Sequence, residues 1–198
     1  RKMKEHGTHL CCSIGFLTEK QALMLKEAGL DRINHNLNSS RAYYHNICST
    51  HTFEQRVANI KMLQGLGFEI CSGGIIGMGE SKEDVVDMLL ELREIRPEAL
   101  PINFLLPIPG TPLEHADMSA LTTAYCMKVL CLARLLVPQS DIRCAAGREI
   151  YFKGEEKNLL RVVDSIFASG YLTAGGQGIK DTIQAIEDAG FTYEIKSA

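Results

Sequence analysis

Residues 68–95 read FEICSGGIIGMGESKEDVVDMLLELREI and contain one complete strand-to-helix unit. The apolar run over 68–76 predicts a strand, and the glycines that follow it predict a tight turn. Ser81 is a favourable helix-capping residue, and a helix fits the stretch from there to Ile95. The same plan of strand, turn and helix recurs along the chain.

This pattern predicts six strands, each followed by a helix. The strands are expected over residues 9–14, 31–36, 68–76, 99–106, 141–146 and 165–172. The helices are expected over residues 18–29, 52–67, 81–95, 119–136, 155–163 and 177–190. Strands that alternate with helices indicate a parallel sheet with right-handed crossovers.

The spacing of these units favours a barrel. They average about 33 residues each, as in a TIM-type (β/α)₈ barrel. We therefore predict an α/β fold in which residues 1–198 form one domain of about six βα units, an incomplete barrel; an open doubly wound sheet is the alternative. Polar or reactive residues end nearly every strand, as expected where strands converge on a barrel mouth. They are Cys11, Cys12, Asn34, Asn36, Cys71, Asn103 and Arg143.

The composition is that of an ordinary folded domain. The chain has 198 residues, of which 45% are hydrophobic and 23% charged, with a net charge of -3. No basic excess or long apolar run points to nucleic acid or a membrane. The seven cysteines are scattered and odd in number, which favours a reducing cytoplasm over a disulfide framework.

The amides of Asn34 and Asn36 lie two positions apart and should face the same side of a strand. They could bind a ureido ring or ribose hydroxyls, or only form local turns. His35 should point the other way, as a structural histidine. The glycines after Cys71 would let a nucleotide-like ligand approach the backbone, or serve only the turn. Cys71 itself could be a small buried apolar residue.

Arg143 should lie on a barrel strand, where a guanidinium is costly unless it is paired. No acidic residue is evident nearby in the sequence. We expect Cys11, Cys71 and an anionic cluster to supply the negative charge, with a distant salt bridge as the alternative. Strand alternation predicts that Cys144 faces outward.

Several segments resemble biotin synthases in order and spacing. They are Asn34-His35-Asn36-Leu37, Tyr43-Tyr44, Cys71-Ser72-Gly73-Gly74-Ile75, Gly77-Met78-Gly79-Glu80, Pro101-Ile102-Asn103, Gly110-Thr111-Pro112-Leu113, Gly147-Arg148 and Ser165-Ile166-Phe167. This resemblance implies a radical S-adenosylmethionine (SAM) barrel. It also implies a [4Fe–4S] cluster on a CxxxCxxC loop and an auxiliary, sulfur-donating cluster held by three cysteines and an arginine.

The resemblance also implies residue roles. Cys11, Cys71 and Arg143 would be ligands of the auxiliary cluster, [2Fe–2S] or larger, and Cys71 and Arg143 would take part in catalysis. The residues near SAM would be Asn34, Asn36, Asn38, Arg56 and Ile75, and those near dethiobiotin Asn36 and Asn103. Asn38 stands where the family usually has an aspartate, which leaves that contact open.

The activity so implied is radical SAM-dependent insertion of sulfur into dethiobiotin to form biotin, in a homodimer supplied with electrons by flavodoxin or ferredoxin. No CxxxCxxC occurs in the chain, so we expect it to be the C-terminal two-thirds of such an enzyme, unable to cleave SAM alone. One alternative is another radical SAM enzyme, of the hydrogenase-cofactor maturase or methylornithine synthase type, which Cys71 with Arg143 disfavours. The others are a truncated, non-catalytic ligand-binding protein and a phosphate-binding barrel using residues 173–176.

Overall fold

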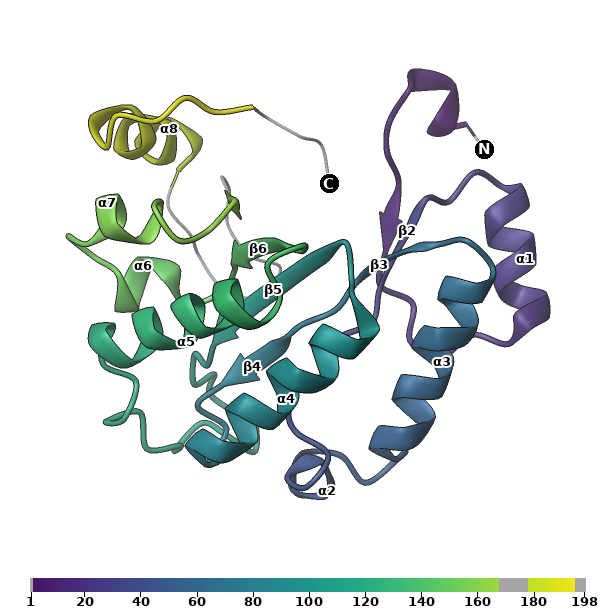
Figure 1. The fold of residues 1–198 in the computed structure, drawn as a ribbon, viewed down its shortest axis with the longest axis horizontal. Helices are drawn as coiled ribbons and strands as arrows, with labels where there is room; N and C mark the ends of the chain where they lie inside the picture. Colours follow the sequence, from purple (N-terminus) through teal and green to yellow (C-terminus); the bar gives the residue numbers. More distant parts are fainter. Residues whose placement is uncertain (1, 168–177, 195–198) are drawn as a thin grey trace.

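The computed structural model describes residues 2–167 and 178–194 (Figure 1). Its centre is a parallel sheet in the order β1-β2-β3-β5-β6-β7, with β4 paired to β5. The strands are β1 (Cys11–Cys12), β2 (Arg32–Asn34), β3 (Glu69–Cys71), β4 (Gly74–Ile76), β5 (Ala99–Phe104), β6 (Asp141–Cys144) and β7 (Ser165–Ile166). All six predicted strands therefore have a counterpart. The first five are shorter than predicted at one or both ends, and residues 168–172 of the sixth lie outside the described residues.

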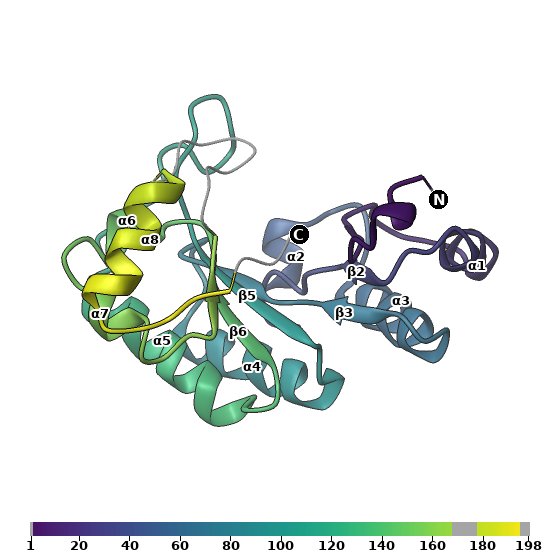
Figure 2. The same cartoon turned by 90° about the horizontal axis from the view of Figure 1, so that it is seen from above.

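Helices connect the strands and cover one side of the sheet. They are η1 (Lys4–His6), α1 (Glu19–Glu27), α2 (Tyr44–Ile47), α3 (Phe53–Gly65), α4 (Lys82–Ile95), α5 (Thr123–Leu136), α6 (Arg148–Tyr151), α7 (Glu156–Leu159) and α8 (Ile179–Asp188). Figure 2 shows that α1, α3, α4 and α5 follow the outside of the curved sheet. This curled half-barrel confirms the predicted TIM-like class rather than a doubly wound sheet, which has helices on both faces. Within the described residues, no helix is long and apolar enough to span a bilayer.

The two faces of the sheet differ in chemistry. Partners in register on parallel strands point to the same side, and alternate residues point to opposite sides. The outer face carries Ile33, Ile70 and Ile142, all fully buried. The inner face is mainly polar. It carries Cys11, Arg32, Asn34, Glu69, Cys71, Asn103, Asp141, Arg143 and Ser165, together with Ile75, Ala99 and Pro101. The hydrophobic core thus lies between sheet and helices, and the concave side is left for polar chemistry.

The predicted strand over 68–76 is in fact two strands. β3 pairs with β2, whereas β4 pairs with β5 and has a single bridge to Asn38. Ser72 and Gly73 lie between them, where the chain moves from one neighbour to the other. This difference depends on which strand lies alongside and could not be seen in a continuous apolar run.

The helix predictions were accurate where the apolar stripe is long. The side chains of Thr52 and Ser81 cap α3 and α4 as expected, each within a reciprocal capping box. The helix predicted from residue 119 begins at Thr123, capped by Thr122. That predicted over 155–163 is only the four-residue α7, and α2 and α6 were missed because such short helices carry no periodic signal. Residues 168–177, including the phosphate-cup candidate, lie outside the described residues.

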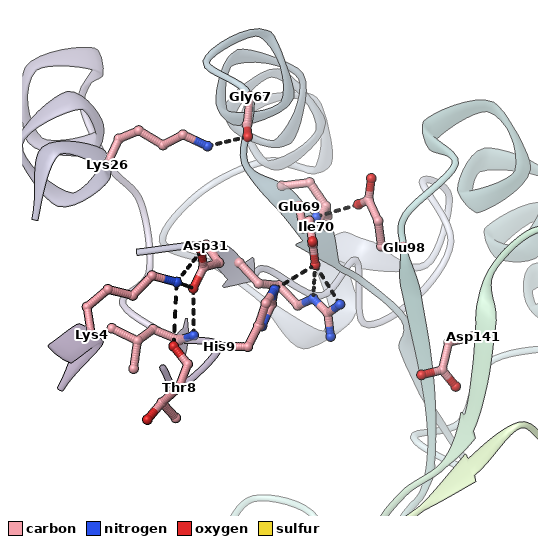
Figure 3. A network of polar contacts seen from close by, with 12 residues as sticks. Lys4, Thr8, His9, Lys26, Asp31, Gly67, Glu69, Ile70, Glu98 and Asp141 are labelled. Atoms are coloured by element: carbon pink, nitrogen blue, oxygen red, sulfur yellow. Dashed lines mark hydrogen bonds and ion pairs between the residues drawn. The ribbon is translucent and has the colours of Figure 1, made fainter. Parts of the chain in front are cut away.

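Carboxylates at the start of strands tie each strand to its neighbour (Figure 3). The Asp31 carboxylate accepts the Leu10 amide at 2.8 Å, and Glu98 accepts the Ile70 amide at 2.6 Å. Asp31 also accepts both contacts of the Lys4 ammonium, at 2.7 and 2.6 Å. These bonds stabilise the sheet register at the end of the barrel opposite the mouth.

Asp31→Asn is expected to lower the free energy of unfolding at neutral pH by about 1 kcal/mol. The Leu10 amide and Lys4 hold the pKa of Asp31 below its ordinary value. A depressed carboxyl pKa contributes stability that is present above the unfolded pKa and lost as the pH falls through the folded pKa. The difference between wild type and Asp31→Asn, measured by urea unfolding, should therefore shrink at acid pH. Asp87→Asn, at an exposed site on α4, is the control. A pH-independent difference would contradict the assignment.

Candidate functional site

The inner face brings Cys11, Cys71 and Arg143 together. Cys71 ends β3, and its side chain is buried. Register places Cys11, one strand beyond β2, and Arg143, on the far side of β5, on the same face as Cys71. The Asn34 amide donates to the Cys71 sulfur at 3.5 Å. The structure therefore places the two candidate thiols and the candidate arginine as predicted from strand alternation.

Both thiols are protonated at neutral pH in the chain alone. Burial raises the pKa of Cys71 to about 11, and Arg143 and Arg32 oppose this shift. Burial also raises the pKa of Cys11, where Arg32 is the leading opposing charge. Binding iron requires thiolates, so a metal at this face would release protons.

Arg143 has an acidic partner on its own strand. Its Nη2 lies 3.2 Å from an Asp141 oxygen, and its Nε donates to the Ser165 hydroxyl at 2.9 Å. Ser165 in turn donates to Asp141 at 2.7 Å. The prediction that no acidic residue lies near Arg143 was wrong. Asp141 lies two positions earlier, and strand alternation returns it to the same face. The guanidinium is thus oriented without any thiolate.

A second guanidinium occupies the same face. Arg32 donates through Nε and Nη2 to one Glu69 oxygen, at 2.9 and 2.6 Å, and His9 lies 3.3 Å from that oxygen (Figure 3). The sequence analysis missed this pair. The spacing in the sequence could have revealed this pair. Arg32 lies two residues before the candidate Asn34, and Glu69 lies two residues before the candidate Cys71.

The candidate asparagines bind neighbouring backbone. The Asn36 side chain accepts the Gly73 amide at 3.1 Å. Asn103 donates to the Gly74 carbonyl at 3.2 Å and accepts the Ala146 amide at 3.2 Å. Asn38 has a left-handed φ of 71°, a conformation that asparagine tolerates well. These amides join the strand ends into one rim, and Ile75 lies there in register with Asn103.

The glycines after Cys71 pack against the chain itself. A Cβ on Gly73 would lie 1.8 Å from the Pro101 carbonyl oxygen, and one on Gly74 would lie 2.2 Å from the Met88 sulfur. The close approach is therefore made by this protein's own atoms. It accounts for these two glycines without a ligand.

Arg56 lies in a separate cluster near the rim. It donates to the Tyr44 hydroxyl at 2.6 Å, the Asn36 carbonyl at 2.9 Å and the His51 ring at 2.7 Å. Burial and the Arg56 charge lower the pKa of His51, which favours a neutral ring that can accept this bond. A hollow of about 600 Å³, lined partly by Phe16 and His51, lies beside the cluster. Arg56 thus positions the main chain of Asn36.

His35, which was expected to be a structural residue, and Cys144, which was expected to face outward, are both buried. His35 is 2% exposed, and burial with the Arg56 and His51 charges lowers its pKa to about 4. Cys144 is fully buried in the core on the outer face, as predicted, and burial raises its pKa to about 12. Cys126, on α5, is likewise fully buried in the core.

The thiols of the inner face are an incomplete metal site by themselves. Across residues 2–167 and 178–194, no group of three or more His, Cys, Asp or Glu side chains is placed to hold a metal ion. Cys11 and Cys71 belong to strands separated by β2 and are offset by two residues in register, so their backbones are about 12 Å apart. A polynuclear cluster, whose thiolate ligands bind different iron atoms, can join two strands that are this far apart.

Comparison with known proteins shows what the chain is similar to. The Radical SAM superfamily model matches residues 1–92, and the Biotin and Thiamin Synthesis associated domain matches residues 101–192. The chain is 43% identical over 190 residues to the biotin synthase of Renibacterium salmoninarum, which covers 96% of the chain and 55% of that relative. The chain is thus similar to biotin synthases over nearly all of its own length. It spans about half the length of the curated biotin synthases it matches.

Solved structures support the fold of this chain. Methylornithine synthase superposes with a TM-score of 0.75 at 19% identity, covering all of the chain and 61% of that protein. The FeFe-hydrogenase maturase of Carboxydothermus hydrogenoformans gives 0.73 at 15% identity, covering 91% of the chain and 47% of the maturase. At such identities the likeness extends to the fold alone.

Proposed function

We propose that the whole protein is a biotin synthase that inserts sulfur into dethiobiotin in a radical SAM reaction. The observation that carries this proposal is the joint placement of Cys11, Cys71 and Arg143 on the polar inner face. The 43% identity to biotin synthases over most of the chain supports it. SAM would supply the radical that removes hydrogen from the substrate, and the auxiliary iron–sulfur cluster would supply the sulfur.

The donor set on the inner face fits part of an auxiliary cluster. Two thiols are soft ligands suited to iron and sulfide, and they lie within a wall that also presents positive charge. Cys11 and Cys71 would bind iron as thiolates. Arg143, held by Asp141 and Ser165, would adjust the geometry and charge of the site. A further cysteine would come from residues that precede this chain in the whole protein.

The rim residues would hold SAM and dethiobiotin. We assign Asn34, Asn36, Asn38, Arg56 and Ile75 to the SAM side, and Asn36 and Asn103 to the substrate side. Arg56 would act through Asn36, whose carbonyl it holds at 2.9 Å. Asn103 would hold β4 and the chain after β6 in place, because its amide nitrogen donates to the Gly74 carbonyl and its amide oxygen accepts the Ala146 amide.

The remaining parts of the proposal concern the whole protein. A [4Fe–4S] cluster would be held by a CxxxCxxC loop outside this chain, and an electron donor such as flavodoxin or ferredoxin would reduce it. We also propose that the enzyme is cytoplasmic and a homodimer. The exposed apolar side chains of Ile14 and Phe16, just beyond the edge strand β1, are compatible with coverage by other protein surface.

Ligand and iron measurements test the proposal. Anaerobically purified whole protein with iron and sulfide restored should convert dethiobiotin to biotin in the presence of SAM and a reductant. The main rival is a non-catalytic protein that holds a biotin-like ligand. Dethiobiotin binding, measured by calorimetry, without iron uptake or biotin formation would support the rival and reject the proposal.

A further inference from the structure

Arg32 lies beside one of the candidate cluster thiols. It is the register partner of Cys11 on β1 and of Glu69 on β3. Neighbouring strands are about 4.8 Å apart and such partners share a face, so Arg32 lies between the strands of Cys11 and Cys71. The side chain is 23% exposed. It is therefore part of the inner wall rather than a freely solvated cation.

The Glu69 carboxylate keeps Arg32 in that wall. Both Arg32 donors that reach Glu69 converge on one oxygen. The arrangement parallels the other side of β3, where Asp141 and Ser165 hold Arg143. Two guanidiniums, each with its own carboxylate, therefore lie on either side of β3, Arg32 on the neighbouring strand β2 and Arg143 two strands away on β6.

The charge of Arg32 acts on the thiols. Arg32 lies on β2, the strand next to Cys11, whereas Arg143 lies on β6, which β2, β3 and β5 separate from β1. Arginine keeps its charge under all ordinary conditions. Arg32 therefore provides a fixed positive charge on the strand next to Cys11.

We propose that Arg32, held by Glu69, is a further positioning residue of the cluster site, which keeps a fixed positive charge beside Cys11. This inference rests on the proposed function, since it concerns the cluster that Cys11 and Cys71 would hold. A cluster bound by thiolates becomes more negative on reduction, and a nearby cation favours the reduced form. Arg32 would therefore raise the midpoint potential of the cluster, and Glu69 would lower it.

The test compares variants with opposite charge effects in the reconstituted whole protein. Arg32→Met should lower the midpoint potential of the auxiliary cluster, and Glu69→Gln should raise it. Arg32→Lys, which keeps the charge, should remain close to wild type. The potential is read from the visible absorption of the cluster during a redox titration, with iron content measured in parallel. Lys26→Met is the control, because Lys26 is an exposed cation on α1 that binds the Gly67 carbonyl.

General damage to the site would shift the midpoint potential of both variants in the same direction. It therefore cannot cause opposite shifts in Arg32→Met and Glu69→Gln. If the wild-type protein holds an auxiliary cluster and both variants have the wild-type midpoint potential, the inference about Arg32 is overturned while the proposed function stands. If wild type binds no auxiliary cluster, the proposed function itself fails. If Arg32→Met loses iron, Glu69→Gln still tests the inference. A raised midpoint potential in Glu69→Gln supports the inference, and an unchanged midpoint potential rejects it.

Discussion

Replacing Cys71 by alanine is expected to reduce biotin formation in the whole enzyme by more than about 100-fold, because a thiolate ligand has no substitute at this position. Arg143→Met should cause a smaller loss. A guanidinium is a poor ligand, and the cysteines should dominate retention of the cluster. Single-turnover biotin formation and iron content, measured on both variants after reconstitution, give the ranking.

Cys144→Ala is the matched control for this experiment. Cys144 follows Arg143 directly, yet it faces the opposite side of β6 and is fully buried in the core. Its loss should cost some stability but retain the cluster and the activity. Full activity in Cys71→Ala would exclude Cys71 as a ligand and remove the basis of the proposed function.

Gly73→Ala should destabilise the chain by more than about 4 kcal/mol or prevent folding, since the added Cβ would lie 1.8 Å from the Pro101 carbonyl oxygen. Neither backbone can yield, because Pro101 lies within β5 and the Gly73 amide and carbonyl are bonded to Asn36 and Asn38. Urea unfolding followed by circular dichroism measures the effect.

Two other glycines calibrate this prediction. Gly74→Ala would meet the flexible Met88 side chain at 2.2 Å and should cost less than Gly73→Ala. Gly65 ends α3 with no atom within 4 Å of an added Cβ, so Gly65→Ala should be neutral or stabilise by about 0.5–1 kcal/mol. Equal effects at Gly73 and Gly65 would show that the contact with Pro101 is not tight.

The order of strands and helices could be predicted from local pattern alone. A strand or a long amphipathic helix buries one face, and that requirement appears as apolar periodicity within a short window. Capping residues marked the starts of α3 and α4 for the same reason, since a cap bonds to backbone only a few residues away. Strand alternation also separated Cys71 and Arg143 from the outward Cys144.

Contacts between strands were decided by the tertiary structure. From the sequence, Arg143 was expected to face thiolates and an anionic cluster, or a distant salt bridge, whereas register gives it Asp141 and Ser165. The pair of Arg32 with Glu69 was not predicted. β3 and β4 read as one strand because their different neighbours are remote in sequence. Local periodicity shows which side a residue faces, but the residue opposite is set by packing of distant segments. The sequence by itself therefore determined the half-barrel and its candidate ligands, and only the folded sheet determined how their charges are paired.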